Sequence, residues 1–211
     1  THLRIDLTDR SEIEDAFSRY KPQRVVNLAA QAGVRYSLEN PRAYIDANVV
    51  GTFNVMEAAR RNEISHLLMA STSSVYGANT DMPFREVSKS DTQLTIYAAT
   101  KKATEVMAHS YSHIHELPVT AFRFFTVYGP WGSPDMALFK FTKSILEEKP
   151  IDVFNHGKHI RDFTYIDDIV EGIVKTIDKP ATSNLNWDSS LPDNASSKAL
   201  LEALSGRLLS Q

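Results

Sequence analysis

A tyrosine and a lysine four residues apart, Tyr97 and Lys101, could carry acid–base chemistry. On a helix this spacing places both side chains on one face. A phenol has a pKa of about 10, and lowering it to about 7 requires roughly 4 kcal/mol. A cation about 4 Å away supplies roughly that much at an effective dielectric constant near 20. Lys101 could therefore let Tyr97 act as a base near neutral pH. The alternative interpretation is an exposed ion-pair face that Glu105 completes one turn further on.

A run of hydroxyl side chains, STSSVYG at residues 71–77, follows an apolar run that predicts a buried strand. Hydroxyls at the carboxyl end of a parallel strand lie where open α/β sheets bind ligands. Thr72 comes 25 residues before Tyr97, on the neighbouring strand–helix unit, so the two side chains can converge. The alternative is a polar turn in which a hydroxyl caps a short helix.

The elements that must position these side chains alternate between strands and helices, which predicts a parallel sheet built from βα units. The run at 25–30 is almost continuously apolar, as in a strand buried on both faces. The sequence SEIE at 11–14 has the spacing of a capping box and opens a helix. The predicted strands are 2–7, 25–30, 67–71, 119–125 and 151–154. The predicted helices are 11–20, 42–62, 96–115, 136–148, 165–178 and 198–210, with a polar loop at 180–197.

The composition excludes several classes of protein. The 211 residues are 42% hydrophobic and 23% charged, which is typical of a globular chain. No run approaches the roughly 18 apolar residues of a membrane span, and no signal peptide is visible. The chain has no cysteine, which excludes disulfides and thiolate chemistry and suits a reducing cytoplasm. The net charge of −3 argues against a broad nucleic-acid surface. His109, His113 and His115 lack acidic partners and predict a solvated helix face, with no metal site.

Five motifs occur in the order seen in extended short-chain dehydrogenases/reductases, the family of nucleotide-sugar epimerases and dehydratases, which the chain resembles. They are NLAA at 27–30, NVVGT at 48–52, SSVYG at 73–77, YAATK at 97–101 and RDFTYIDD at 161–168. The chain is more closely similar to UDP-glucuronate 4-epimerases. That similarity lies in AQAGVRYS at 30–37, RFFTVYGPWG at 123–132 and PDMA at 134–137.

The resemblance implies a Rossmann-like, doubly wound parallel sheet over residues 1–130 that binds NAD. Residues 131–211 would form a smaller nucleotide-sugar-binding region. In such enzymes a tightly held NAD takes a hydride from C4 of the sugar, and the 4-keto intermediate receives it back on its other face. By this likeness Tyr97 removes the O4 proton, Lys101 lowers the pKa of Tyr97 and holds the nicotinamide ribose, and Thr72 hydrogen-bonds O4. A homodimer through the helices at 42–62 and 96–115 is also implied.

The resemblance assigns further residues to the two ligands. On the cofactor side they are Asp6, Leu7, Leu28, Ala29, Ala30, Asn48, Tyr97, Lys101 and Phe124. On the substrate side they are Thr72, Ser73, Ser74, Thr126, Phe154 and Arg161. Arg161 would meet the UDP diphosphate, since arginine can bind phosphate through two hydrogen bonds. Its alternative role is an ion pair with Asp162 or Asp168.

Ser73 and Ser74 separate the reactions of the family. Sugar dehydratases and uronate decarboxylases tend to carry acidic residues in this loop, because elimination needs a general acid and base. Two serines could instead hydrogen-bond a C6 carboxylate, which favours C4 epimerisation of UDP-glucuronate to UDP-galacturonate. Ser133 stands where related epimerases usually carry arginine, which weakens the case for glucuronate. The alternatives are a UDP-hexose 4-epimerase or, less favoured, a UDP-glucuronate decarboxylase.

The glycine-rich motif that opens the family fold, Gly-x-x-Gly-x-x-Gly, does not occur in the 211 residues. In the strand order 3-2-1-4-5-6, the two absent strands would lie between residues 3–7 and 25–30. The expectation is therefore a working enzyme about half as long again as this chain. From a different class of function, the alternative is an inactive fragment or a nucleotide-sugar-binding homologue.

Overall fold

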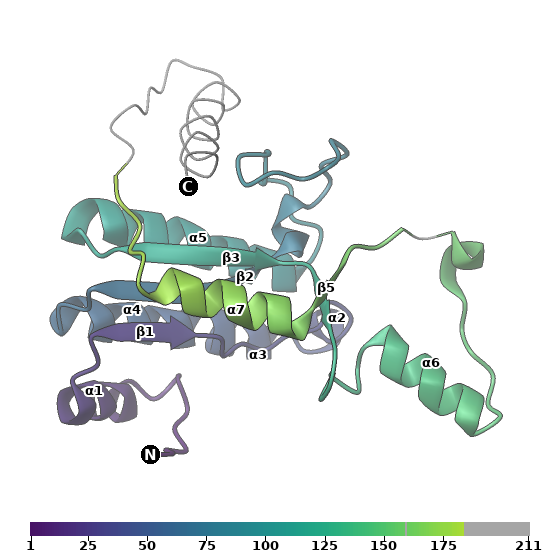
Figure 1. Ribbon diagram of the computed structural model, residues 1–211, viewed down its shortest axis with the longest axis horizontal. Helices are drawn as coiled ribbons and strands as arrows, with labels where there is room; N and C mark the ends of the chain where they lie inside the picture. Colours follow the sequence, from purple (N-terminus) through teal and green to yellow (C-terminus); the bar gives the residue numbers. More distant parts are fainter. Residues whose placement is uncertain (159, 184–211) are drawn as a thin grey trace.

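The computed structural model describes residues 1–158 and 160–183, and it forms three layers around a parallel sheet (Figure 1). The strands are β1 (Arg24–Asn27), β2 (His66–Thr72), β3 (Val119–Phe124), β4 (Thr126–Tyr128) and β5 (Phe163–Tyr165). The α-helices are α1 (Arg10–Tyr20), α2 (Tyr36–Glu39), α3 (Pro41–Tyr44), α4 (Gly51–Arg61), α5 (Ile96–His115), α6 (Ala137–Leu146) and α7 (Ile166–Ile177). Two 3₁₀ turns, Ser73–Tyr76 and Phe154–Gly157, and a π-helix, Ile45–Val50, complete the described elements.

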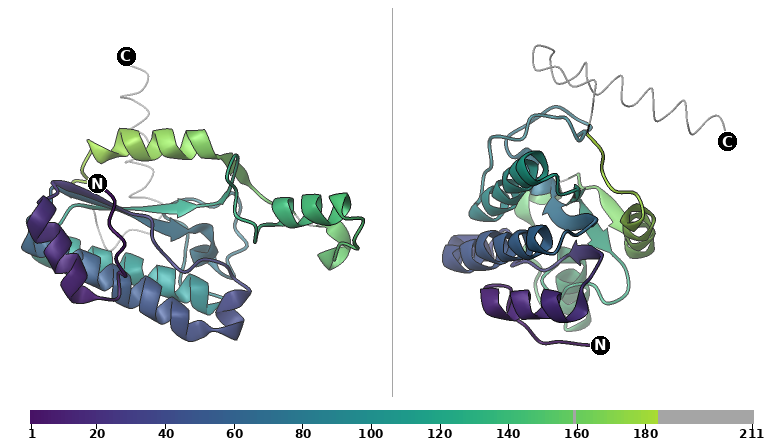
Figure 2. Two further views of the ribbon diagram at one scale, coloured as in Figure 1. Left: turned by 90° about the horizontal axis from the view of Figure 1, so that it is seen from below. Right: turned by 90° about the vertical axis from the view of Figure 1, so that its left-hand side faces the viewer.

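The main sheet has the order β1-β2-β3 with all strands parallel, as the alternation of elements predicted. A second, two-stranded parallel sheet pairs β4 with β5. The pairing of β5 escaped prediction because its three residues lie between polar segments. Helices α1, α4 and α5 cover one face of the main sheet and α7 covers the other (Figure 2). The expected doubly wound parallel fold is confirmed.

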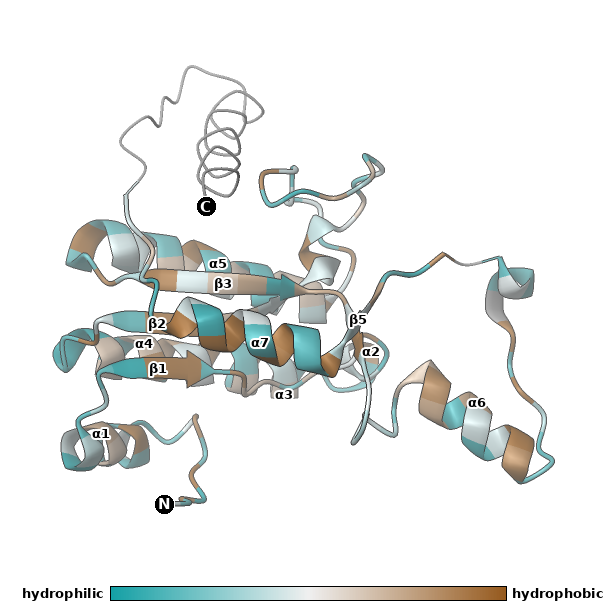
Figure 3. Cartoon of the chain, viewed as in Figure 1, coloured by the Kyte–Doolittle hydropathy of each residue, from teal (hydrophilic) through white to brown (hydrophobic). Residues whose placement is uncertain are grey.

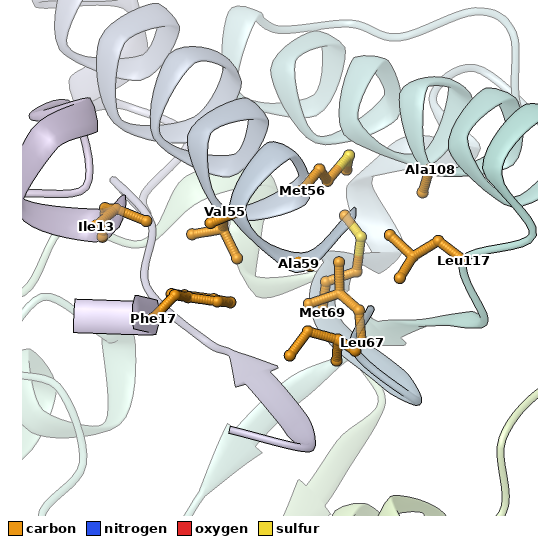
Figure 4. Packing of buried hydrophobic residues seen from close by; sticks show 11 residues of the cluster. Ile13, Phe17, Val55, Met56, Ala59, Leu67, Met69, Ala108 and Leu117 are labelled. Carbon is orange, nitrogen blue, oxygen red and sulfur yellow. The ribbon is translucent and has the colours of Figure 1, made fainter. Parts of the chain in front are cut away.

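The main hydrophobic core lies between β2 and the helices α1, α4 and α5 (Figure 4). Leu67 and Met69 point into it from alternate positions of β2, as the pleat of a strand requires. His66, on the other face of β2, is fully buried and lies 3.1 Å from the carbonyl of Ile177 and 2.9 Å from the hydroxyl of Thr120. These two contacts fasten the end of α7 to the sheet.

Local sequence explains where the helices begin. Asp9 caps α1 by accepting hydrogen bonds from the backbone of Ser11 and Glu12, so the helix starts one residue before the expected capping box. Thr95 caps α5 in the same way, at 3.2 Å from the backbone nitrogen of Ala98. The predicted helix 96–115 is confirmed at both ends.

Two predicted strands are absent, and a third is shorter than predicted. Residues 2–7 form no strand, because no described strand lies beside them to complete a ladder. The strand 25–30 ends at Asn27, and Val26 is 37% exposed because β1 is the edge of the described sheet. Residues 151–153 pair with no described strand, and Phe154 begins a 3₁₀ turn, so the predicted strand 151–154 does not form.

The predicted helix at 42–62 is interrupted. It divides into α3, the π-helix Ile45–Val50 and α4, which follow one another without a loop. Helix α6 buries none of its side chains, and its apolar residues appear as brown bands in Figure 3. The predicted helix 198–210 and most of the loop 180–197 lie outside the described residues.

Candidate functional site

Thr72 is the last residue of β2, at the carboxyl end of the sheet, and is 7% exposed. Its hydroxyl accepts a hydrogen bond from the backbone nitrogen of Ser74 at 3.2 Å and so caps the turn Ser73–Tyr76. The capping role considered for this loop is therefore confirmed for Thr72. The cap holds the Thr72 side chain at the end of β2. Gly77 closes the turn with φ +59°, and a Cβ there would lie 1.9 Å from the carbonyl oxygen of Thr92.

Lys101 lies on α5 with only 4% of its surface exposed. Its Nζ donates a hydrogen bond to the carbonyl of Ala70 at 2.8 Å, so the ammonium group meets β2 two residues before Thr72. Burial lowers the pKa of Lys101 to about 8. About nine-tenths of this lysine therefore remains protonated at pH 7. The alternative of an exposed ion-pair face is wrong for Lys101.

Tyr97 is half-buried one turn before Lys101. Its ring packs edge-on against Tyr44, with 6.0 Å between the centroids. The hydroxyl of Tyr44 lies 2.8 Å from the carbonyl of Ala32 and 2.5 Å from that of Gly33. Tyr44 is fully buried, and burial raises the pKa of its phenol. Tyr44 thus links the loop after β1 to the predicted catalytic tyrosine.

Asn48 lies in the π-helix and is fully buried. Its side-chain oxygen accepts a hydrogen bond from the backbone nitrogen of Gln31 at 2.8 Å. Its side-chain nitrogen donates to the carbonyl of Gln31 and to the hydroxyl of Thr100, each at 3.1 Å. π-Turns are frequent at functional sites. Here the π-turn directs Asn48 to join the loop after β1 to α5, a role that the sequence did not reveal.

The other cofactor-side residues lie around the same end of the sheet. Leu28, Ala29 and Ala30 follow β1 and are exposed. Leu7 packs on the start of α4, since a Cβ built on Gly51 would lie 3.0 Å from the Cβ of Leu7.

Asp6 and Phe124 complete the predicted cofactor set, and both have local contacts. The carboxylate of Asp6 accepts hydrogen bonds from the backbone nitrogen and the hydroxyl of Thr8, each at 2.9 Å. These bonds hold the pKa of Asp6 below its usual value. The half-buried ring of Phe124 stacks on Phe122 with 5.5 Å between the centroids. Contacts of either residue with a cofactor stay predictions.

The predicted substrate-side residues fall into two groups. Ser73 and Ser74 are half-buried beside Thr72, and Thr126 is half-buried in β4. Phe154 begins a 3₁₀ turn and not a strand, on the segment between α6 and β5 that extends away from the main sheet (Figure 1). Arg161, on the same segment, is exposed and donates to the carbonyl of Ile160 at 3.1 Å. Within the described residues it forms no ion pair with Asp162 or Asp168.

A partly buried ion pair between Glu105 and Arg123 lies next to the hydroxyl loop, and the sequence interpretation did not anticipate it. The guanidinium meets the carboxylate through two hydrogen bonds, at 2.9 and 2.8 Å. The signal was present in the sequence, because Arg123 is a lone charge in an otherwise apolar strand. A charge in such a position is rarely buried without a partner.

The part of the chain that the structure describes lacks two further features. No three histidine, aspartate or glutamate side chains gather there in a way that could hold a metal ion. No helix there is long and apolar enough to cross a membrane.

Comparison with known proteins identifies relatives along most of the chain. Residues 1–186 match the model of the NAD dependent epimerase/dehydratase family. The chain is 55% identical over 199 residues to Protein CapI of Staphylococcus aureus. This match covers 94% of this chain and 60% of that protein. It is 57% identical over 169 residues to a probable UDP-glucuronate 4-epimerase of Rhizobium meliloti, covering 80% of this chain and 50% of that protein. The chain thus spans about half the length of the curated relatives that it matches.

Solved structures agree with these matches. The fold superposes with a TM-score of 0.77 on the UDP-glucuronic acid 4-epimerase of Bacillus cereus, solved with UDP-glucuronic acid and NAD. The two chains are 33% identical, and the match covers 87% of this chain and 56% of that one. The UDP-glucose 4-epimerase of Thermus thermophilus, solved with NAD, gives a TM-score of 0.76 at 28% identity, covering 83% of this chain and 60% of that one. From the family match and the shared fold together, the chain belongs to the NAD dependent epimerase/dehydratase family.

Proposed function

We propose that this chain carries the catalytic face of an NAD-dependent UDP-glucuronate 4-epimerase. The observation that carries the proposal is the buried Lys101, which meets β2 at Ala70, two residues before Thr72, and lies one turn from Tyr97. Relatives named as UDP-glucuronate 4-epimerases and a neighbour solved with UDP-glucuronic acid and NAD support the choice of substrate.

The residues at the sheet end suit part of a nicotinamide cofactor. An ammonium group has three donors, and the hydrogen bond to Ala70 that the described residues show uses one. The remaining donors of Lys101 could meet ribose hydroxyls. Ala29 and Ala30 are small and exposed after β1, which leaves room for a close approach of the cofactor. Residues 1–211 contain no glycine-rich motif of the dinucleotide-binding type, so we assign no residue to the pyrophosphate.

When bound, NAD would supply the redox chemistry, accepting a hydride from C4 of the sugar and returning it to the opposite face. Tyr97 would remove the proton of the O4 hydroxyl, and the cationic Lys101 would stabilise the phenolate that acts as base. Thr72 would hydrogen-bond O4 and orient it toward Tyr97. Ser73 and Ser74 would donate hydrogen bonds to the C6 carboxylate without protonating the ring carbons.

The other predicted site residues are proposed on the resemblance and their placement. Asp6, Leu7, Leu28, Asn48 and Phe124 would lie along the cofactor, with Asn48 acting through the loop that it holds. Thr126, Phe154 and Arg161 would contact the UDP moiety. In this division residues 1–130 serve the cofactor and 131–211 the nucleotide sugar, although α7 packs back onto the main sheet.

We also propose that the protein is a cytoplasmic homodimer. Exposed apolar side chains on the π-helix, α4 and α5 support a helix-to-helix interface; they are Ile45, Val50, Phe53, Val106 and Ile114. The cytoplasmic assignment depends on the proposed use of NAD and a nucleotide sugar. Light scattering of the purified chain tests the dimer, and cell fractionation tests the location.

The activity is tested by incubating the purified chain with UDP-glucuronate and NAD and resolving the products by chromatography. We expect UDP-galacturonate, and its absence contradicts the proposal. UDP-xylose would indicate decarboxylation, and interconversion of UDP-glucose and UDP-galactose would indicate the alternative, a UDP-hexose 4-epimerase. Binding of UDP-glucuronate without turnover would indicate a binding homologue. Tyr97→Phe is expected to abolish turnover while leaving UDP binding intact.

A further inference from the structure

The loop between β2 and α5 carries Thr72, Ser73 and Ser74, so its position relative to Tyr97 determines whether the proposed site can work. The turn itself is held by a local hydrogen bond from Gly77 to the carbonyl of Ser74 at 3.1 Å and by one from the side chain of Gln93 to the carbonyl of Val75 at 2.8 Å. A more extensive network of hydrogen bonds lies next to the loop, around the carboxylate of Glu105; we call this network the anchor.

Glu105 follows Lys101 by one helical turn and Tyr97 by two, so all three side chains share one face of α5. Its side chain is 10% exposed. One oxygen accepts a hydrogen bond from the hydroxyl of Ser71 at 2.6 Å, and Ser71 immediately precedes Thr72 in β2. The carboxylate therefore ties the helix that carries Tyr97 to the strand that carries Thr72.

The partners of Glu105 extend the anchor to the later part of the loop between β2 and α5, at Glu86 and Ser90. Arg123 of β3 makes two hydrogen bonds to the carboxylate and donates to the carbonyl of Glu86 at 2.9 Å. Its guanidinium also lies 4.9 Å from the ring centre of Tyr76, within the range of a cation–π contact. Lys102 donates to Glu105 at 3.1 Å and to the hydroxyl of Ser90 at 2.8 Å.

The carboxylate is held in its charged form. Burial disfavours the ionised form of Glu105, but the hydrogen bonds from Arg123 and Ser71 outweigh it, so its pKa lies below the ordinary value. Because the group stays ionised at neutral pH, its strong hydrogen bonds fix two strands, one helix and the loop around a single point.

We propose that Glu105 is a positioning residue for the reaction: through Ser71 and Arg123 it holds Thr72 and the hydroxyl loop in register with Tyr97 and Lys101. This inference rests on the proposed function and extends it to a residue that does not touch the substrate. A misplacement of about 1 Å at a reacting group can lower a rate by about a hundredfold.

Two variants and one matched control test the inference. Glu105→Gln keeps the shape of the side chain but removes the charge that Arg123 and Lys102 require. Ser71→Ala removes only the link to β2 and leaves the ion pair, so it remains informative if the first variant folds poorly. The control is Glu14→Gln, since Glu14, like Glu105, pairs with two cationic side chains, here Arg10 at 2.7 Å and Arg61, but lies on α1.

Two measurements are made on each protein. Turnover of UDP-glucuronate is expected to show kcat lowered about 10- to 100-fold in Glu105→Gln and about tenfold in Ser71→Ala, with KM changed less than about threefold. Amide hydrogen exchange at residues 72–77 is expected to accelerate about tenfold in both variants. The control should match wild type in both measurements.

Each outcome decides a separate point. If the wild type is active and the two variants keep its kcat, the inference is overturned and the proposed function stands, whatever the exchange rates show. If the wild type is inactive on UDP-glucuronate, the proposed function fails, and exchange alone decides whether Glu105 holds the loop. Equal exchange in wild type, Glu105→Gln and Ser71→Ala overturns the inference in either case.

Discussion

Replacing Lys101 with methionine removes an ammonium group that the fold buries next to the carbonyl of Ala70. Burial lowers the pKa of Lys101 from 10.5 to about 8. At roughly 1.4 kcal/mol per unit, this shift corresponds to a penalty of about 3 kcal/mol for keeping the folded lysine charged. The residue is almost fully buried, so solvent screening reduces this value little.

The sign of the pH dependence follows from proton binding. Below pH 8 both the folded and the unfolded chain hold the proton on Lys101, and the penalty is present in full. Between about pH 8 and 10.5 the unfolded chain holds the proton while the folded chain releases it, so the free energy of unfolding rises with pH. The Lys101→Met variant lacks this contribution. At pH 7 it should be about 2 kcal/mol more stable than wild type, after allowing about 1 kcal/mol for the lost hydrogen bond.

The assay is urea denaturation of wild type and variant in steps from pH 6.5 to 10.5. We expect the stability difference between Lys101→Met and wild type to fall by about 3 kcal/mol across this range, from about 2 kcal/mol in favour of the variant to about 1 kcal/mol in favour of wild type. Lys175→Met is the control, because Lys175 is a lysine on α7 whose side chain is 70% exposed. A difference between Lys101→Met and wild type that stays constant with pH would refute the reasoning.

The remaining predictions concern stability and are measured by chemical denaturation at neutral pH. Gly77→Ala should lower the free energy of unfolding by at least about 2 kcal/mol, because the added methyl group would clash with the backbone of Thr92 and the residue has a left-handed backbone conformation. Gly172→Ala is the contrasting substitution, in α7, where an added Cβ would have no atom within 4 Å. It should raise the free energy of unfolding by about 0.5–1 kcal/mol. Asn48→Ala should cost about 3 kcal/mol by leaving both backbone groups of Gln31 without their partner. A loss below about 0.5 kcal/mol would contradict the role assigned to Asn48.

The sequence predicted the parallel sheet and α5 well because their signals are local. The apolar run before Thr72 and the 20-residue periodic segment after Thr95 each determine one element without help from distant residues. The order of the motifs also placed Tyr97, Lys101 and Thr72 at one end of the sheet. The burial of Lys101 was not predictable, because it depends on the packing of α5 against β2.

The failures share a physical cause, which is dependence on partners far away in the chain. Residues 2–7 and 151–154 have strand-like composition, but a strand forms only where another strand completes its hydrogen bonds. The anchor at Glu105 was missed because its partners Ser71 and Arg123 lie 34 and 18 residues away. Composition alone could not show that these three side chains meet.

The π-helix has a consequence for how the segment before α4 can vary. Its hydrogen bonds reach one residue further along the chain than those of an α-helix, so it accommodates an additional residue. Deleting one residue from Ile45–Val50 would remove this additional residue and let the segment close into an α-helix, which would change where Asn48 lies around the helix relative to α4. Asn48 could then no longer meet both Gln31 and Thr100, although many substitutions elsewhere in the segment would leave those bonds intact. The length of this segment is therefore constrained more tightly than its composition.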